Sequence, residues 1–566
     1  MACGYVTLLG LIGSLIYFLG QLQCMPILVL RAIGYSFSAV GVVVSVFYLK
    51  SLFRKSRACV QGWKRSEPWA RCDYFLMSFV VLALALCAFG PPTDADSLDY
   101  HLGVPLGMLR QGGFVASSAW MHSRLIGLGE HLNLLGLAMG TDNLGAALSL
   151  SALIWLVLLI GGFTKDVRRR RLVLKLLIGM PVLLFLVPNQ KAQLIASMAL
   201  LAAFLHDRES PADVRHLLLT AGAVLFSCSM KYSFYVVALA VFATMAFRHF
   251  RSSKREGFLL VASMLCGYIV LLFPIHCFNF INYHNPVSPF LSGLFGDVAG
   301  QVATAFSHHL SEYSEGLVFP ANLLLPASAG SVSTVLGVGV LAYCFVKRQG
   351  SHGKDSALLA VGCAVAVTFL CQRTSRFYVE AYLFAALALG EAAELRRWYD
   401  KFSMILTVQL LGVALFAALG AAVLFPGILS WEWRDKVMSR AAHEYAAMQE
   451  LDRILPEDAV LFCDLRSHAL VPRPFIAQNY LDYWGAPEGG PVMEHIRNSV
   501  SDEMFVAMHT PVELPQHPLL PFISSTLLDG KGHPVGTRNP FNNLTIPLYV
   551  YKLDSRALQR YLDGAQ

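Results

Sequence analysis

Two adjoining stretches decide the fold: YFLMSFVVLALALCAFG, residues 74–90, runs directly into PPTDADSLDYHLGVPLGMLR, residues 91–110. The first stretch is almost entirely apolar and long enough to cross most of a bilayer as a helix. The second places Asp94, Asp96 and Asp99 just where the apolar run ends. This order predicts a membrane-spanning helix that is followed directly by a group of acids at the membrane surface. At such a place a general base can act on a lipid-borne substrate.

The composition supports a polytopic membrane protein, because 55% of the 566 residues are hydrophobic and only 14% are charged. The net charge is +7, and the basic residues form short clusters between apolar runs. Such clusters are typical of topology signals and do not indicate nucleic-acid binding. The 12 cysteines are scattered without metal-ligand spacing. The N-terminus lacks a basic region before its apolar run, so we expect a retained first span and not a cleaved signal peptide.

The apolar runs predict about 13 transmembrane helices, several of them shorter than the ~20 residues that a perpendicular span needs. The first two spans are the least certain, since Arg31 lies in the hairpin that they form. The expected spans are 4–22, 27–50, 74–90, 143–163, 172–187, 190–205, 216–230, 232–247, 257–274, 331–347, 356–371, 376–391 and 403–426.

Lys and Arg clusters in the short connections predict the orientation, because such clusters remain in the cytoplasm. With this number of spans, every cluster falls on one side of the membrane, with the N-terminus cytoplasmic and the C-terminus outside. The clusters are Arg54–Arg65, Lys165–Arg171, Arg208–Arg215, Arg248–Arg255, Lys347–Lys354 and Arg396–Lys401.

The regions expected outside are the loops 91–142 and 275–330 and the C-terminal part. Leucines recur at helical spacing in the loop 91–142, which predicts amphipathic helices lying in the membrane interface. Residues 430–566 are richer in polar residues and turn signals and predict a small α/β domain. The expected fold class is therefore an all-α polytopic membrane domain, residues 1–429, followed by an extracytoplasmic domain, residues 430–566.

Asp96 is the first candidate catalytic residue. The three acids of this loop are also readable as ordinary solvated carboxylates. However, they lie directly at the end of a span, alternate with apolar residues and precede Tyr100 and His101. A carboxylate shielded from water beside a membrane can have a raised pKa suited to proton abstraction.

The segment Asp96–Leu102, DSLDYHL, resembles the D-x-L-x-Y-H-L signature of bacterial membrane glycosyltransferases of the C-type (GT-C) superfamily. The resemblance implies that Asp96 activates the acceptor hydroxyl, which displaces polyprenyl phosphate from the sugar. Asp94 is a second candidate, since some members use a D-x-D pair. Tyr100 and His101 are the substrate-binding candidates of the motif. The chain departs from the family after this motif, where Gly103 replaces a common proline.

Two further segments carry the resemblance. Glu130 in GLGEHLNLLGLAMG resembles a G-x-E segment of the family, although it is also readable as an exposed acid on an interfacial helix. Lys231 and Tyr232 resemble the family's T-K-Y turn. Arg373 and Arg376 resemble a basic-aromatic entry to a late span, where the family's Arg contacts the donor phosphate.

Cations on the outer side need a reason, because the positive-inside trend disfavours them there. Lys191 and Lys231 are expected at outer turns, where binding a lipid phosphate would explain them. For Arg376 the alternative is an ion pair with Glu380 four residues on. His284 in HCFNFINYHNPVSPF is a further substrate-binding candidate, although such a proline-rich segment is more often structural.

The sequence thus predicts transfer of a sugar from a polyprenyl-phosphate donor to a lipid, glycan or protein acceptor of the cell envelope. The expected location is a bacterial inner membrane, with membrane lipids and no nucleic acid as further partners. No metal or other cofactor is required, although an Asp94/Asp96 pair leaves a divalent ion open. The alternative is a transporter or lipid-linked-saccharide flippase, which would place charges near the midplane and show repeated halves. A third interpretation is a scaffold subunit that has lost catalysis. The presence of Asp96 argues against it, because such a subunit would be expected to lose this residue.

Overall fold

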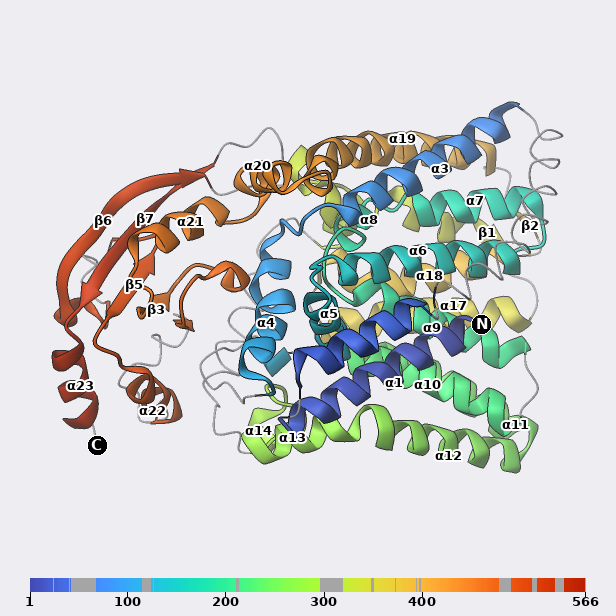
Figure 1. Ribbon diagram of the computed structural model, residues 1–566. Helices are drawn as coiled ribbons and strands as arrows, with labels where there is room; N and C mark the ends of the chain where they lie inside the picture. Colours follow the sequence, from blue (N-terminus) through green and yellow to red (C-terminus); the bar gives the residue numbers. More distant parts are fainter. Residues whose placement is uncertain are drawn as a thin grey trace.

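The computed structural model describes most of the chain as helices, with a small sheet at one end (Figure 1). The residues it describes are 1–23, 25–39, 41, 68–114, 124–125, 127–209, 213–295, 319–347, 351–371, 373–392, 394–395, 399–477, 490–511, 517–534 and 544–564. Parts of the expected connection after the second span and of the loop 275–330 lie outside the described residues.

Six helices in the described residues are long and apolar enough to cross a membrane, and a bent pair can form a seventh span. The chain is therefore an integral membrane protein, although the predicted count of 13 spans is not confirmed. The spanning helices are α1 (Ala2–Gln21), α3 (Pro68–Phe89), α6 (Leu144–Phe163), α11 (Phe234–Ser252), α17 (Ser351–Leu370) and α19 (Tyr399–Leu424). The bent pair is α12 (Lys254–Leu271) with α13 (Phe273–Tyr283), at an angle of 51°.

The shorter helices complete the bundle. Those in its middle, α9 and α10, are buried on nearly all sides, as expected of helices that are apolar all round. The shorter helices are Ile27–Ala39, α7 (Val167–Ile178), α8 (Leu183–Leu186), α9 (Gln193–Glu209), α10 (Val214–Met230), α14 (Ser292–Phe295), α16 (Ala321–Leu324) and α18 (Val379–Gly390).

The expected span at 331–347 is wrong. The structure has two 3₁₀ helices there, η3 (Ala329–Thr334) and η4 (Val338–Phe345), followed by the short strand β1 (Val346–Lys347). Gly337 separates them with a φ of 87°, a conformation that interrupts a right-handed helix. Strand β1 pairs antiparallel with β2 (Glu394–Leu395). Apolar composition alone therefore misassigned this segment.

Helix α19 shows how the bundle meets its surroundings. Its buried face carries Leu406, Leu410 and Val413, which pack in the core. Its outer face exposes an apolar stripe, which recurs at intervals of three and four residues as expected of one helix face. The stripe is Met404, Val408, Leu411 and Leu415, each more than half exposed. An apolar stripe of this kind fits contact with lipid.

The loop after α3 folds back into the protein. It forms a π-helix, η1 (Ser97–His101), then α4 (Leu102–Gln111) and α5 (Leu128–Ala138). The expectation of an exposed interfacial helix is wrong for α5, because all but one of its residues are buried. Its polar residues, among them Glu130, therefore face protein and not the membrane surface.

The C-terminal part contains the expected small sheet, shown in orange and red in Figure 1. The strand order is β4-β3-β5-β7-β6, with β3 parallel to β4 and β5, and with β5–β7 and β7–β6 antiparallel. The strands are β3 (Val460–Cys463), β4 (Phe475–Ala477), β5 (Met504–Met508), β6 (Ile523–Pro534) and β7 (Thr545–Leu553). The helical elements are η6 (Phe425–Ile428), α20 (Trp431–Ala441), α21 (Tyr445–Ile454), η7 (His468–Leu470), α22 (Gly490–Ser499), η10 (Leu520–Phe522) and α23 (Ser555–Gly564).

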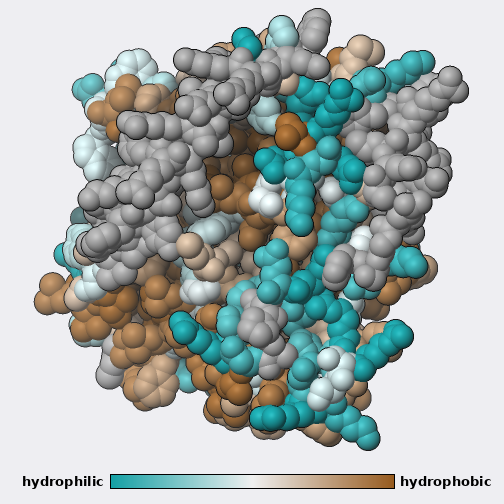
Figure 2. Space-filling view, turned by 90° about the vertical axis from the view of Figure 1, so that its right-hand side faces the viewer, coloured by the Kyte–Doolittle hydropathy of each residue, from teal (hydrophilic) through white to brown (hydrophobic). Residues whose placement is uncertain are grey.

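The two ends of the bundle carry different elements. The end at the left of Figure 1 holds η1 and lies against the C-terminal domain. The opposite end holds the connections α6–α7 and α11–α12, with exposed Arg168, Arg251, Lys254 and Arg255. Figure 2 views this end and shows hydrophilic residues at its centre and right, with hydrophobic residues gathered at the lower left. These basic connections thus lie at one end, as the sequence predicts.

Candidate functional site

The site is built around the start of η1. Asp94 lies just before this helix, and its Oδ1 accepts a hydrogen bond of 3.0 Å from the backbone N–H of Ser97. The hydroxyl of Ser97 in turn accepts from the N–H of Gln190 at 2.9 Å, which ties η1 to the segment before α9. A π-helix adds a residue to the turn and often marks a functional site. Here it directs Asp99 and His101 toward different neighbours.

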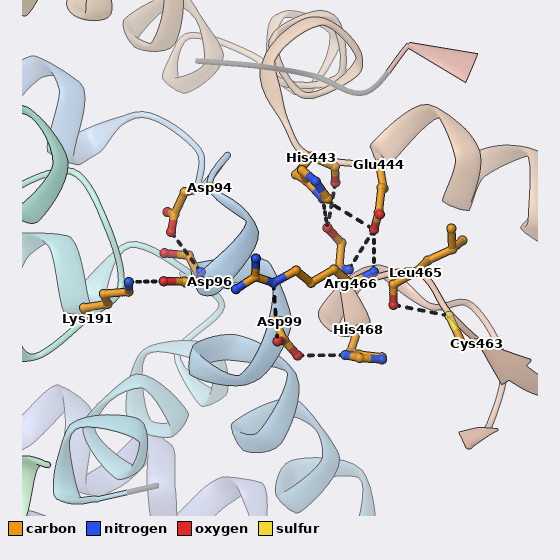
Figure 3. A network of polar contacts seen from close by, with 12 residues as sticks. Asp94, Asp96, Asp99, Lys191, His443, Glu444, Cys463, Leu465, Arg466 and His468 are labelled. Carbon is orange, nitrogen blue, oxygen red and sulfur yellow. Dashed lines mark hydrogen bonds and ion pairs between the residues drawn. The ribbon is translucent and has the colours of Figure 1, made fainter. Parts of the chain in front are cut away.

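Asp96 is held by cations from three separate parts of the chain. Figure 3 shows two of them, Lys191 and Arg466. Its Oδ2 pairs with the ammonium of Lys191 and lies 3.3 Å from Nη1 of Arg376. Its Oδ1 lies 2.5 Å from Nη2 of Arg466. Both carboxylate oxygens are therefore engaged, each on a different side.

These cations set the protonation of Asp96. Burial by itself raises the pKa of this carboxyl, but Lys191, Arg466 and Arg376 outweigh it and hold the pKa well below its usual range. The expectation of a raised pKa from shielding is therefore wrong for Asp96 as it stands here. The group is an ionised carboxylate, and a change in its cation partners would raise its basicity.

The lysines of the site are poised differently from ordinary surface lysines. Burial, and then the charge of Arg376, lowers the pKa of Lys191 to about 7. Lys191 lies between α8 and α9, where its backbone N–H donates to Asn189 Oδ1 at 2.9 Å. Burial and Arg376 also lower the pKa of Lys231, at the end of α10, to about 8. Both lysines lie outside the spanning helices, at the same end of the bundle as Asp96.

Arg376 belongs to η5 (Ser375–Tyr378), directly before α18. The alternative of an ion pair with Glu380 is not what the structure shows. Arg376 pairs with Asp96, whereas Oε1 of Glu380 accepts a hydrogen bond from the hydroxyl of Ser197. The carbonyl of Arg376 accepts from the side-chain amide of Gln193. The residue therefore joins η5 to η1 and to α9.

Glu130 and His101 form a buried pair at the end of η1 that is farther from Asp96. Nδ1 of His101 lies 2.7 Å from Oε1 of Glu130, and Oε2 of Glu130 accepts from the N–H of Gly127 at 2.7 Å. Burial lowers the pKa of His101, which favours a neutral ring that donates from Nδ1. Asn133 Nδ2 donates to the carbonyls of His101 and Gln190, both at 3.0 Å. These contacts fix the far end of η1.

Tyr100 lies on the same helix and is buried. Burial, and then the charges of Asp96 and Glu130, raises its pKa well above the usual value. The hydroxyl is therefore protonated and can donate a hydrogen bond.

Three predicted residues lie outside this group by the contacts described. Tyr232 Oη accepts from Asn279 Nδ2 at 2.6 Å, and its ring lies against Phe290. Arg373 is exposed and donates to the carbonyl of Thr368 at 3.3 Å. His284 is exposed at the end of α13, with a φ of 55°.

The C-terminal domain contributes residues that the sequence analysis missed. Arg466 reaches Asp96, and His468 Nδ1 lies 2.7 Å from Oδ1 of Asp99. Both residues follow β3: Arg466 lies in the loop that leads to η7, and His468 is the first residue of η7. A signal was present, because polar residues directly after the carboxyl end of a parallel strand often form sites. Among the described residues, no group of three or more His, Cys, Asp or Glu side chains could hold a metal ion.

Fold and site together define a helical integral membrane protein with an acid–cation cluster at one end of its bundle, beside a small α/β domain. The chain belongs to the DUF1420 family, since the family model described as "DUF1420 N-terminal domain" matches residues 51–438. No curated protein matches the chain in sequence.

Two solved structures are similar to it. One is ArnT from Cupriavidus metallidurans bound to undecaprenyl phosphate, with 12% identity and a TM-score of 0.43, covering 84% of this chain and 98% of that chain. The other is the archaeal oligosaccharyltransferase AglB from Archaeoglobus fulgidus, in complex with an inhibitory peptide and a dolichol-phosphate. It has 12% identity and a TM-score of 0.31, covering 77% of this chain and 69% of that chain. At these TM-scores, neither likeness assigns a function to this chain.

Proposed function

We propose that this chain is a membrane glycosyltransferase of the GT-C type. It transfers a sugar from a polyprenyl-phosphate donor to a cell-envelope acceptor at the extracytoplasmic face of a bacterial inner membrane. The basic connections at the far end of the bundle support this orientation, because such clusters stay in the cytoplasm. The acid–cation cluster and the C-terminal domain then lie outside.

The observation that carries the proposal is the shared oxygen of Asp96. Lys191, between α8 and α9, and Arg376, directly before α18, both approach its Oδ2. A lipid phosphate offers these cations more negative charge and more acceptor oxygens than one carboxylate does. The phosphate would therefore take Lys191 and Arg376 from Asp96, while its polyprenyl chain stays in the hydrocarbon.

Donor binding then prepares the base. As Lys191 and Arg376 turn to the phosphate, Oδ2 of Asp96 loses the cations that depress its pKa, and its basicity rises. The acceptor hydroxyl oxygen forms a bond to the anomeric carbon, and its proton passes to Oδ2. The bond between the anomeric carbon and the phosphate oxygen breaks, and the electron pair leaves with polyprenyl phosphate. The cations stabilise the charge that develops on that phosphate.

The other residues near Asp96 support this role. Glu130 and His101 fix the end of η1, and Lys231 adds positive charge to the donor side. Asp94 remains the second candidate base. Tyr232, Arg373 and His284 remain predicted contacts to more distant parts of the donor or acceptor. We propose that Lys191 and Arg376 neutralise the leaving phosphate without a divalent metal, so transfer should survive a chelator.

A flippase for lipid-linked saccharides is the competing function. The bend between α12 and α13 favours it, because transporters often build sites from interrupted helices. The residues near the bend are Tyr235 and Tyr268, whose hydroxyls lie 2.9 and 3.1 Å from the ring nitrogens of His276. The cations and carboxylates that suit a phosphate lie instead around Asp96, at the helix ends.

The test uses purified full-length protein in lipid nanodiscs and in sealed vesicles, with a panel of polyprenyl-phosphate sugars. We expect sugar transfer to an envelope glycan or lipid fraction in both preparations, with and without EDTA. Arg376→Gln should weaken binding of undecaprenyl phosphate, whereas Arg251→Gln, at an exposed arginine at the opposite end of the bundle, should not. Movement of the donor across sealed vesicles without transfer of any sugar would contradict the proposal and favour the flippase.

A further inference from the structure

We propose that Arg466, which the C-terminal domain carries into the site, is a positioning residue for Asp96. It holds Oδ1 of this carboxylate so that Oδ2 is the oxygen that receives the acceptor's proton. The inference rests on the proposed function and adds to it a part for the C-terminal domain, without which the site is incomplete.

The geometry of Arg466 suits this role. Its guanidinium bridges two carboxylates of the membrane domain, with Nη2 2.5 Å from Asp96 Oδ1 and Nε 4.0 Å from Asp99 Oδ2. A planar guanidinium that bridges two groups fixes their relative orientation, which a single ammonium cannot do. Asp96 and Asp99 flank the first turn of η1, so Arg466 secures this turn from the outside.

The loop that carries Arg466 is itself held in place. Oε2 of Glu444 accepts hydrogen bonds from the backbone N–H groups of Arg466 and Ser467, at 2.8 and 2.9 Å (Figure 3). Oε1 of Glu444 lies 3.0 Å from Nε2 of His509, the residue directly after β5. Glu444 has a φ of 59°, unusual for a residue with a side chain, and such conformations persist where surroundings enforce them. The carboxylate therefore shapes the loop that presents Arg466.

The same loop is docked on η1 by further contacts. His468 pairs with Asp99, and both side chains are buried. An apolar cluster beside them joins the two parts of the chain and consists of Leu98, Leu102, Met438 and Ala442. The backbone N–H of His443 also donates to the carbonyl of Thr93 at 3.1 Å. The position of Arg466 is thus set by a packed interface and not by one ion pair.

The two oxygens of Asp96 therefore have different partners. Lys191 and Arg376 on Oδ2 belong to the membrane domain, where a lipid phosphate would arrive, whereas Arg466 on Oδ1 is already balanced by Asp96 and Asp99 together. We expect the phosphate to take the first two cations and leave the third in place. Among the described residues, the charged and titratable groups around Asp96 include Lys191, Lys231, Arg376, Arg466, Asp94, Asp99, Glu130 and Tyr100.

The test compares Arg466→Gln with wild type and with Arg453→Gln, a matched control in the same domain. Arg453 is exposed and pairs with Glu450 at 2.7 Å. Steady-state transfer gives kcat and the donor KM. Infrared titration of the Asp96 carboxyl in nanodiscs, identified by its loss in Asp96→Asn, reports on the same contact without turnover. Melting temperatures establish that each variant is folded.

We expect Arg466→Gln to lower kcat about 10- to 100-fold, as loss of an orienting partner does, with little change in donor KM. Loss of one cation should also raise the Asp96 pKa, and thus move the acid limb of kcat/KM to higher pH. Arg466→Lys should keep the Asp96 titration close to wild type but recover kcat only in part, because it cannot bridge Asp99. Arg453→Gln should change neither.

Two results would overturn the inference. One is an Arg466→Gln variant with wild-type kcat and wild-type Asp96 titration. The other is a raised donor KM at unchanged kcat, which would make Arg466 a phosphate contact. If Arg466→Gln does not fold, Arg466→Lys decides, because full kcat in that variant would contradict the bridging role. Absence of transfer by wild type would sink the proposed function, whereas the infrared titration would still report whether Arg466 holds Asp96.

Discussion

Asp96 receives positive charge from both sides, and its two oxygens are held by different domains. Lys191 and Arg376 of the membrane domain contact Oδ2, and Arg466 of the C-terminal domain contacts Oδ1. The cost of burying this carboxylate is offset only because all these partners are cations. A ligand that competes for any of them changes the chemistry of Asp96 directly.

Lys191 gives a prediction for pH dependence. Its pKa is lowered to about 7, so its ammonium is present below that pH and is lost as the pH rises through it. We expect the affinity for undecaprenyl phosphate to fall between about pH 6 and 8 in wild type. Lys191→Arg should remove most of this dependence, because arginine stays protonated throughout. Binding titrations at several pH values in nanodiscs would check this, and an unchanged pH dependence in Lys191→Arg would assign it to another group.

At the scale of elements, the π-helix η1 is the feature that gathers the site. It begins just after Asp96, and its residues make contacts to three surroundings: Ser97 to the segment before α9, His101 to α5, and Asp99 to the C-terminal domain. Asp94 caps this helix through the N–H of Ser97. Asp94 therefore stabilises the start of η1, in addition to being the second candidate base.

Substitution of Asp94 separates these two roles. Asparagine caps helices about as well as aspartate, so Asp94→Asn should keep stability and transfer near wild type if Asp94 acts as a cap. Asp94→Ala should lower the free energy of unfolding by about 0.5–2 kcal/mol and reduce transfer through displacement of η1. Thermal melts and initial rates would be compared. Loss of transfer in Asp94→Asn at unchanged stability would instead make Asp94 the base.

The sequence predicted elements well where one physical signal dominates. Long apolar runs predicted α6 and α19 close to their observed limits, whereas α3 begins earlier and α11 ends later than expected. The same signal failed at 331–347, where Gly337 interrupts the helix, and at α5, whose spacing of leucines does not distinguish a membrane surface from a protein interior. Nothing in the local sequence separates the π-helix η1 from an ordinary helical turn. Its geometry depends on the surroundings that its residues contact.

At the scale of the whole molecule, the C-terminal domain is docked on the end of the bundle that carries the site. Met438 and Ala442 pack against Leu98 and Leu102 of the first loop. Arg434 of α20 pairs with Asp142 in the turn before α6. We therefore expect docking of this domain and activity to be linked.

Met438→Ala tests this link. Removal of a buried methionine should lower the free energy of unfolding by about 2–5 kcal/mol and loosen the contact with η1, which should reduce transfer. Met404→Ala is the matched control, because Met404 is 65% exposed on the lipid-facing stripe of α19 and should change little. Melting temperature and initial rate would be measured for both. Equal behaviour of the two variants would show that docking at Met438 does not support the site.

The long-range contacts of the fold also explain which residues of the site could be predicted from the sequence. Lys191 was a candidate because a cation at an outer turn conflicts with the positive-inside trend, and this conflict is visible in sequence. Arg376 was a candidate because its segment resembles a basic-aromatic motif. Arg466 was missed because it meets Asp96 across 370 positions of the chain. Its place after a parallel strand indicates a site but does not identify Asp96 as its partner. The low pKa of Asp96 was missed for the same reason, since its causes are cations brought together only by folding.

The central claim is that Asp96 removes the proton from the acceptor. The most direct measurement is the rate of sugar transfer by Asp96→Asn beside wild type, at saturating polyprenyl-phosphate sugar, together with the affinity for undecaprenyl phosphate. The account predicts a loss of about 10²–10⁴-fold in kcat, the range of general-base catalysis, with binding of the lipid phosphate retained. Transfer by Asp96→Asn at the wild-type rate would contradict the account.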